Sequence, residues 1–457
     1  MIAIQGRRYI IPGIILAALA VVLLSTDRSH VVIREQVDKY KQYQQGKKDA
    51  PKQAKPPGPK YLPAPEYVPP PVVDPFISLA IPPPPSIPHW NVPEKNLHKK
   101  YQLPYAPPLF IGFTRGWPLL LQAVVSYITA GWPASQIYVI ENTGTQWANP
   151  RGRLSLQNPF YLDYDGLRKL GVNIIQTPVL LNFAQLQNFY MHLSQEYEWP
   201  YYFWSHMDVI VSSYEGGHNG KPKAGEVGYQ TIYENCLAEL NTTLHSNDRW
   251  GTRFFAYDHL TLVNRAAYEE VGGWDTYIPY YITDCDMHQR LLMHNWTLDA
   301  RDVGIISDVN TVLKDLRALY RDPSAELDYR DPNPPEKPAA PPSAVEDDKK
   351  DTRDDVPPRE EDDSDDVKYW RKLQAVVDRM VEYKKGDRGR NTWQSSQKGG
   401  EGEPFYYSSR GVQKAFDMLT AVGGQIYEEK WGHRDCALIE GGKLKLEDQW
   451  RVAHDWD

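Results

Sequence analysis

The sequence predicts an α/β fold with a mostly parallel, twisted sheet flanked by helices. Two observations lead to this prediction. Short apolar runs alternate with helical patterns between residues 109 and 320, and strands joined by helices of this length form right-handed units around a parallel sheet. The run YYFWSHMDVIV at 201–211 is apolar at nearly every position, which is typical of a strand buried on both faces.

The individual elements follow from short apolar runs and from the residues that start and stop helices. Pro118 suits a first helical turn and Gly131 a helix end, which predicts a helix over 119–130. Asn182 is a favoured cap for a helix that runs to about Tyr197. The expected strands before 201–211 are 109–113, 137–140 and 172–176. Nearer the carboxyl end we expect a helix over 284–294, another over 410–418 and a strand over 424–428.

The amino-terminal part of the chain has the pattern of a membrane anchor followed by a stem. Arg7 and Arg8 precede an uncharged apolar run of about 17 residues at 9–25, which is short for a membrane span but sufficient. Basic residues before the run favour a cytoplasmic tail at 1–8 and a lumenal body, with a cleaved signal peptide as the alternative. Residues 51–108 hold 19 of the 38 prolines, so 26–108 is expected to be a semi-rigid stem.

A second break in composition divides the body of the chain. Residues 322–366 contain 17 acidic and 6 basic residues, a net charge of −11 against −8 for the whole chain. Such a segment has too few apolar residues for a core. We therefore expect a catalytic core at 109–320, an acidic disordered insertion at 321–366, and the rest of the catalytic domain at 367–457.

Cysteines, sequons and charge limit the functional classes. Three cysteines, at 236, 285 and 436, are too few for a disulfide scaffold, and their odd number leaves at least one unpaired within the chain. Glycosylation sequons at Asn241 and Asn295 are compatible with a lumenal location. No basic cluster with interleaved aromatic residues indicates a nucleic-acid partner.

Polar residues follow the first two predicted strands. Thr114 and Arg115 come after 109–113, and Glu141 and Asn142 come after 137–140. Open α/β sheets bind ligands outside the carboxyl ends of their strands, so these four side chains are candidates for holding a nucleotide. The alternative is that they are ordinary polar residues of solvated loops.

His206 and Asp208 interrupt the most apolar strand of the sequence. Alternation along a strand places both on one face, and a buried carboxylate needs a partner or a metal ion because its desolvation is costly. Asp208 is therefore a candidate ligand for Mn²⁺ or Mg²⁺ on a diphosphate, and His206 a candidate ribose contact, with imidazole better tolerated by Mn²⁺. The alternative is a structural His–Asp pair.

The series FIGFTRG, IYVIENTG and an apolar strand ending in x-x-Asp resembles glycosyltransferases of the GT-A fold. The resemblance implies a Rossmann-like nucleotide half and an acceptor half, with Asp208 as the metal ligand. His206 stands where that family's Asp-x-Asp motif has its first Asp, which is a departure from the pattern.

The acceptor half adds to the resemblance. Residues 262–275 end in GGWD, like the family's helix that ends in Gly-Gly-aromatic-Asp, and implicate Trp274 and Asp275 in substrate binding. Residues 283–291, TDCDMHQRL, resemble its Glu-Asp-x-Asp-Leu-x-x-Arg segment, although Thr283 replaces the Glu. In inverting members the first Asp of this segment is the catalytic base, here Asp284, whose ionised form a helix amino terminus favours. Asp286 is expected to be structural.

A late histidine completes the predicted site. Many GT-A enzymes add a His from near the carboxyl end to the metal ligands, and the segment KWGHRDC supplies His433. A structural histidine is the alternative. The Gly-rich segment 391–407 is expected to be a loop that closes over the donor sugar.

The resemblance is to inverting, family-2-like nucleotide-sugar transferases, and it implies a fungal-type lumenal enzyme. We expect a single-pass type II protein of the Golgi membrane, with the endoplasmic reticulum as the alternative. It would move a sugar from a nucleotide-sugar donor to a hydroxyl group of a glycan, glycoprotein or glycolipid. A retaining transferase, a sugar-nucleotide hydrolase and a non-catalytic binding protein of the same fold remain alternatives.

Overall fold

The computed structural model describes residues 34–42, 45, 58–64, 67–68, 70–77, 85–246, 248–334, 363–386 and 392–456. The chain forms two compact units, 1–66 and 67–457. In the first unit residues 34–42 are helical, and the predicted anchor at 9–25 lies outside the described residues. Within the part of the chain that is described, no helix combines the length and the apolar character that crossing a membrane requires.

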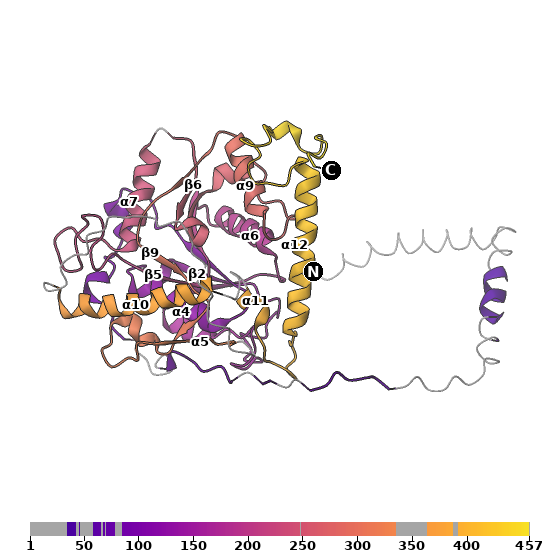
Figure 1. The fold of residues 1–457 in the computed structure, drawn as a ribbon, viewed down its shortest axis with the longest axis horizontal. Coiled ribbons are helices and arrows are strands. Elements are labelled where there is room, and N and C mark those ends of the chain that lie inside the picture. The colour runs from indigo at the N-terminus through magenta and orange to yellow at the C-terminus, as the bar shows by residue number, and fades with distance from the viewer. Residues whose placement is uncertain are drawn as a thin grey trace, which may run out of the picture. The chain divides into compact units, whose positions relative to one another are not determined.

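The second unit is built on a seven-stranded sheet (Figure 1). Within it β7 runs antiparallel to its neighbours β4 and β6, and the other adjacent strands are parallel. The predicted fold class, a mostly parallel sheet flanked by helices, is therefore confirmed. In spatial order the strands are β3 (Asn173–Gln176), β2 (Ile137–Glu141), β1 (Leu109–Phe113), β4 (Tyr201–Ser205), β7 (Leu260–Asn264), β6 (Trp250–Phe255) and β8 (Thr297–Ala300).

Helices connect the strands and cover both faces of the sheet. The helices in the part of the second unit before residue 300 are α3 (Leu97–Lys100), α4 (Trp117–Thr129), α5 (Tyr164–Lys169), α6 (Phe183–Glu196), α7 (Ile232–His245), α8 (Arg265–Glu270) and α9 (Thr283–Met293). The later ones are α10 (Asp365–Lys385), α11 (Thr392–Ser396) and α12 (Ser409–Trp431). Short 3-10 turns are η2 (His89–Asn91), η3 (Ala134–Gln136), η4 (Tyr257–His259), η5 (Leu316–Tyr320) and η7 (Leu446–Asp448).

Two hydrophobic cores lie on opposite faces of the sheet because the buried strands present apolar residues to both. One core joins the strands to α4, α7 and α10, and the other joins them to α6, α8 and α9. Gly112 of β1 permits close packing on the second face, because a Cβ there would lie 2.5 Å from the Tyr190 hydroxyl of α6. The predicted cap of α6 is present, with Asn182 accepting from the Gln185 amide.

The run predicted as one strand over 201–211 is two strands in two sheets. β4 ends at Ser205, and β5 (Val209–Ser212) leaves the large sheet and pairs antiparallel with β9 (Ile305–Asp308). Every residue of both strands is buried, so their composition hides the break. His206 and Asp208 therefore lie in the connection between two strands, and not on one face of a single strand.

The prediction for 410–428 is also wrong, because the helix and strand expected there form one helix, α12. Gly423 and Gly424 suggest a boundary between two elements. In the structure Gly423 instead allows α12 to approach Pro279, whose Cδ would lie 2.9 Å from an added Cβ. In Figure 1 this helix, in yellow, runs along one side of the second unit near α9.

The second unit begins before residue 109, where the stem was expected to end. Phe76, Leu97 and Leu103 are buried in the first core. The predicted insertion at 321–366 also contributes structure at its described ends. β11 (Tyr329–Arg330) pairs with β10 (Val312–Leu313), and Asp363 accepts hydrogen bonds from Lys223 and Arg371. Residues 335–362 lie outside the described chain.

Candidate active site

The candidate site lies where the carboxyl ends of several parallel strands meet. β1, β2, β4 and β6 run in one direction, so the residues that follow them share one edge of the sheet. His206, Met207 and Asp208 follow β4, and Asp258 lies in the turn η4 that follows β6. This edge is where open α/β sheets bind ligands.

Asp208 is buried, at 3% exposure, and is held by side chains from the carboxyl-terminal part of the chain. Its Oδ2 accepts from the Lys384 ammonium at 2.7 Å and from the Trp393 indole at 2.9 Å. The same ammonium donates to Asp308 Oδ1 at 2.5 Å. Asp308 is placed there because β9 pairs with β5, which puts Asp308 opposite Val209. Lys384 therefore bridges two carboxylates.

This ion-pair cluster shifts the pKa values of its members in opposite directions. Burial would raise the pKa of Asp208, but Lys384, His206 and His259 together outweigh that effect, so the pKa lies below its usual value. Burial would lower the pKa of Lys384, but Asp208 and Asp308 hold that pKa above its usual value. Asp208 and Lys384 are therefore both charged at neutral pH.

A histidine links Asp208 to a further carboxylate. His206 Nδ1 lies 3.7 Å from Asp208 Oδ1, and Nε2 lies 3.4 Å from Asp258 Oδ2. These are ion-pair distances rather than well-aligned hydrogen bonds. Burial would lower the pKa of His206, but Asp258 and then Asp208 raise it above its usual value. His259 lies 3.7 Å from Asp308, so acidic and basic groups alternate along this edge.

Asp284 lies at the start of α9, half-buried, on the same side of the sheet. Its Oδ2 accepts a hydrogen bond of 2.8 Å from the hydroxyl of Tyr257, the residue before Asp258. Its position in the first turn lets the helix dipole favour the ionised carboxylate. One turn later, burial holds the pKa of His288 below its usual value, with Asp284 and Asp258 acting in the opposite sense.

Asp286 faces away from this group and is part of a buried network, in agreement with its expected structural role. It is completely buried, pairs with Arg290 at 2.9 Å and Lys430 at 2.7 Å, and accepts from the Trp431 indole at 2.9 Å. Lys430 also pairs with Asp275 at 2.8 Å. Burial would raise the pKa of Asp275, but Lys430 holds it below its usual value.

The carboxyl-terminal segment is fixed to the same helix by a disulfide. Cys285, between Asp284 and Asp286, is bonded to Cys436, and Cys236 is a buried free thiol. Ile278, Tyr427, Trp431 and Leu438 form a small core beside the bond. The sequence left the pairing of the three cysteines open.

The residues predicted to contact the nucleotide lie at the expected edge of the sheet. Two of them, Glu141 and Asn142, already have hydrogen-bond partners within the protein. Glu141 is fully buried and accepts from Thr143, Asn149, Tyr164 and Gln176. Asn142 bonds both the amide and the carbonyl of Leu181 and lies 3.5 Å from the Thr114 hydroxyl. These two side chains stabilise the loops around the edge.

Arg115 has a different environment. It is 4% exposed, and its Nη2 donates to the carbonyl of Gln397 at 3.2 Å. Its Nε and Nη1 are buried and have no hydrogen-bond partner within the described part of the chain. The guanidinium lies over the Phe160 ring, 5.2 Å from its centroid, and burial lowers the pKa to about 10.

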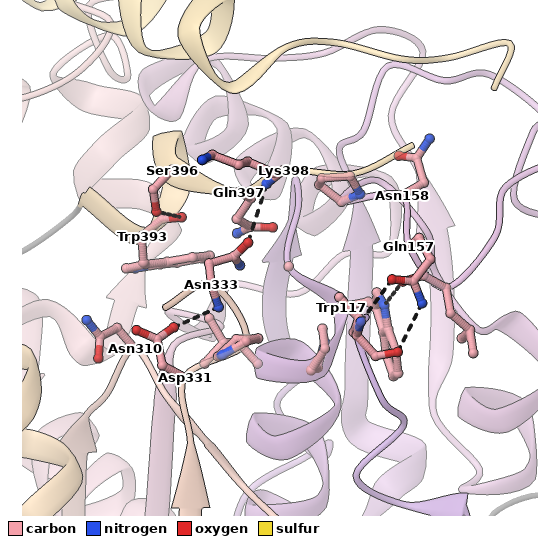
Figure 2. Close-up of a pocket in the computed structure, with 17 residues that line it drawn as sticks. Trp117, Gln157, Asn158, Asn310, Asp331, Asn333, Trp393, Ser396, Gln397 and Lys398 are labelled. Carbon is pink, nitrogen blue, oxygen red and sulfur yellow. Dashed lines mark hydrogen bonds between the residues drawn. The ribbon is translucent and has the colours of Figure 1, made fainter. Parts of the chain in front are cut away.

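The segment predicted as a mobile loop over 391–407 includes α11 and packs on this edge. A Cβ on Gly116 would lie 2.7 Å from Gln397 Nε2 and 3.0 Å from the Trp393 ring, and Gly116 itself has a φ of 88°. Figure 2 shows Trp393, Gln397 and Lys398 facing Trp117 and Gln157 across a small cavity of about 20 Å³. Only glycine at 116 allows this approach.

A larger cleft borders the Lys384 bridge. It has a volume of about 820 Å³ and is lined by β9, by His259 and by one face of α10 that includes Asp378, Lys384 and Lys385. Pockets for small ligands usually measure some 300–1,000 Å³, so this cleft is large enough for one.

The residues present do not fit the expected metal ion. Both carboxylates nearest its predicted place, those of Asp208 and Asp308, are bonded to the Lys384 ammonium. His433, the expected second ligand, pairs with Asp455. Across the described ranges, no group of three or more His, Cys, Asp or Glu side chains is suited to hold a metal ion.

The remaining predicted substrate residues lie in the acceptor half. Trp274 is buried at 4% exposure and packs edge-on against Phe183 at 5.5 Å and His288 at 6.2 Å. Tyr277 and Tyr281, between Asp275 and Asp284, are 77% and 49% exposed. These tyrosines offer an accessible aromatic surface a few residues before Asp284 in the sequence.

Sequence reasoning missed four residues of the cluster: Asp258, His259, Asp308 and Lys384. Trp393 was included only as part of the predicted donor loop 391–407. Asp308 carried a usable signal, because it ends the apolar run of β9 as Asp208 follows the run of β4. Lys384 carried none, since its place in the site depends on how α10 packs.

Comparisons with known proteins give distant structural likenesses. No family model matches the chain, and no curated protein is similar to it in sequence. A mannosyltransferase from Pyrobaculum calidifontis in complex with GDP-mannose and Mn²⁺ is 9% identical over 45% of this chain, with a TM-score of 0.29. This chain covers 60% of that protein.

A cytidylyltransferase from Leptospira borgpetersenii serovar Hardjo-bovis is 8% identical over 43% of this chain and 75% of its own, with a TM-score of 0.27. Both proteins are transferases by name. Structural likenesses this distant say nothing about the activity of this chain. An activity is therefore assigned from the chain's own residues.

Proposed function

We propose that the protein is a glycosyltransferase that moves a sugar from a nucleotide-sugar donor to a hydroxyl acceptor with inversion. The observation that supports this most strongly is the position of Asp284. It lies at a helix amino terminus, half-buried, and is joined through Tyr257 to the strand-end cluster of Asp258, His206 and Asp208.

Asp284 is the proposed catalytic base. Inverting transfer needs one carboxylate that takes the proton of the acceptor hydroxyl while its oxygen attacks the anomeric carbon. The helix dipole favours the ionised form that accepts this proton. The Tyr257 hydroxyl donates to Oδ2, and among the described residues no hydrogen bond to Oδ1 is seen, so Oδ1 is the oxygen proposed to face the acceptor. The exposed rings of Tyr277 and Tyr281 would lie under a sugar acceptor.

The donor would bind at the strand-end edge between Arg115 and the Asp208 cluster. The predicted ribose contact of His206 and the contacts of Thr114, Trp274 and Asp275 remain predictions. Glu141 and Asn142 would act by holding the loops of the nucleotide site, because their own polar atoms already have partners. No step is assigned to a metal ion, since the donor set does not fit one.

The proposal includes the predicted location, a type II protein of the Golgi membrane. The disulfide between Cys285 and Cys436 supports an oxidising compartment. The sequon at Asn295 is exposed, which is compatible with a lumenal body.

The test is the stereochemistry of the product. The full-length chain is incubated with UDP- and GDP-sugars of α configuration and a mixture of oligosaccharide acceptors, and the new linkage is analysed by NMR. We expect one donor class to be used and the new linkage to be β. A retained α linkage would remove the base role of Asp284. Free sugar formed at the same rate without any acceptor would indicate a hydrolase instead.

A further inference from the structure

We propose that Lys384, together with Arg115, binds the diphosphate of the donor in place of a divalent metal ion. The inference rests on the proposed function, because it names the groups that hold the anionic part of the donor. It differs from the site that the sequence predicts, in which Asp208 and His433 would hold Mn²⁺ or Mg²⁺.

An ammonium group occupies the place expected for the metal ion. The Lys384 side chain is 2% exposed, and its Nζ contacts Asp208 Oδ2 and Asp308 Oδ1 at 2.7 and 2.5 Å. A metal ion bound by these two carboxylates would displace the ammonium into a buried position without its partners. Breaking a buried ion pair in this way is strongly unfavourable, because it leaves an uncompensated buried charge.

Lys384 has hydrogen-bonding capacity left over. An ammonium group donates three hydrogen bonds, and two of them go to Asp208 and Asp308. Among the described residues, the third proton makes one long contact, 3.5 Å, with the carbonyl of Val309. Lys384 also lines the cleft of about 820 Å³, so a phosphate oxygen that enters the cleft can accept this proton.

Arg115 points to an anionic ligand independently of Lys384. A buried guanidinium with two nitrogens that lack partners is costly, and within the described residues no carboxylate pairs with Arg115. A guanidinium group matches the geometry of phosphate oxygens. The unsatisfied donors of Arg115 therefore indicate an anionic ligand at the end of β1.

Trp393 connects the two cationic side chains. Its indole nitrogen donates to Asp208 Oδ2, which also accepts from Lys384. Its ring lies beside Gly116, the residue after Arg115, and Figure 2 shows it next to Gln397, whose carbonyl accepts from Arg115. Trp393 thus contacts the carboxylate that holds Lys384 and lies beside the loop that carries Arg115. We infer from this that the two cations bind the two phosphates of one donor.

The role of Asp208 changes accordingly. Instead of binding a metal ion, Asp208 and Asp308 position the Lys384 ammonium and keep it charged. When the sugar is transferred, negative charge develops on the departing diphosphate. A fixed ammonium and a guanidinium stabilise that charge without the need to recruit a metal ion.

The experiment is a thermal-shift measurement on the full-length chain with UDP and GDP as probes, in EDTA and again with added Mn²⁺. A ligand that binds the folded state raises the melting temperature. We expect one nucleoside diphosphate to stabilise the protein equally in EDTA and in Mn²⁺, and the matching nucleoside to stabilise it much less.

The outcomes separate the two proposals. Stabilisation that needs Mn²⁺ would overturn the role of Lys384 and leave the proposed function standing. No stabilisation by UDP or GDP in either condition, in a protein that melts cooperatively, would overturn the proposed function and this inference with it.

A variant tests Lys384 directly. Lys384→Gln should weaken binding of the nucleoside diphosphate about 10- to 100-fold, the usual effect of losing a charged hydrogen bond, while nucleoside binding is unchanged. Lys372→Gln is the matched control, because Lys372 is exposed on the same helix, about 18 Å away along its axis.

Undiminished binding by Lys384→Gln would contradict the inference. If Lys384→Gln does not fold, Lys384→Arg keeps the charge and should retain binding in EDTA. Loss of that binding in a folded Lys384→Arg protein would equally contradict it.

Discussion

At the scale of single residues, two aspartates only two positions apart have opposite surroundings. Asp284 is half-buried with one bond from Tyr257, and Asp286 is fully buried among Arg290, Lys430 and Trp431. The sequence motif could predict this division, because residues two apart on a helix face different ways. It could not predict the partners of Asp286, which come from the distant segment that contains α12.

The buried partners of Asp286 lead to a prediction about stability. Asp286→Asn should lower the free energy of unfolding by about 3–5 kcal/mol, because it leaves the Lys430 and Arg290 charges partly uncompensated. Urea denaturation measures the loss, and Asp417→Asn, an exposed carboxylate on α12, is the control. Equal stability of the two variants would show that the network contributes little.

His206 leads to a prediction about pH. Asp258 and Asp208 raise its pKa above the usual histidine value of about 6.5, against the lowering effect of burial. The protonated form therefore stabilises the folded state fully below about pH 6.5, and this contribution is lost as the pH rises through the raised pKa. His206→Gln should cost more stability at pH 6 than at pH 9, measured as the difference in melting temperature from wild type. A difference that is the same at both pH values would contradict the assignment.

At the scale of elements, the order of strands and helices could be predicted more accurately than where each element ends. The strands β1, β2 and β3 and the cap of α6 lie where the sequence places them, because Gly, Pro and Asn limit short apolar runs. The break after β4 could not be predicted, because the residues on both sides are equally apolar. The continuity of α12 could not be predicted either, because only its contact with Pro279 explains the glycine at position 423.

The disulfide is the covalent link between two distant elements, and it leads to a further prediction. Cys285 and Cys436 are 151 residues apart, and removing a native disulfide costs about 2–5 kcal/mol. Cys436→Ser should therefore melt at a lower temperature than the wild type. A reducing agent should lower the melting temperature of the wild type and leave that of the variant unchanged. An equal response of both proteins would contradict a structural role for the bond.

At the scale of the whole second unit, the sheet collects residues from distant parts of the sequence at one edge. Arg115 follows β1, Asp208 follows β4, Asp258 follows β6, and Lys384 arrives from α10 after the acidic segment. The strand pattern could predict the edge and the first carboxylates. The cation that pairs with them depends on the packing of α10, which no local pattern in the sequence encodes.

The measurement that tests the central claim most directly compares the wild type with Asp284→Asn in release of nucleoside diphosphate. Both proteins are given the donor that stabilises the wild type, with an acceptor mixture. We expect Asp284→Asn to bind the donor with unchanged affinity and to release nucleoside diphosphate about 10²- to 10⁴-fold more slowly, the usual contribution of a general base. Release by the folded variant at the wild-type rate would contradict the assignment of Asp284 as the base.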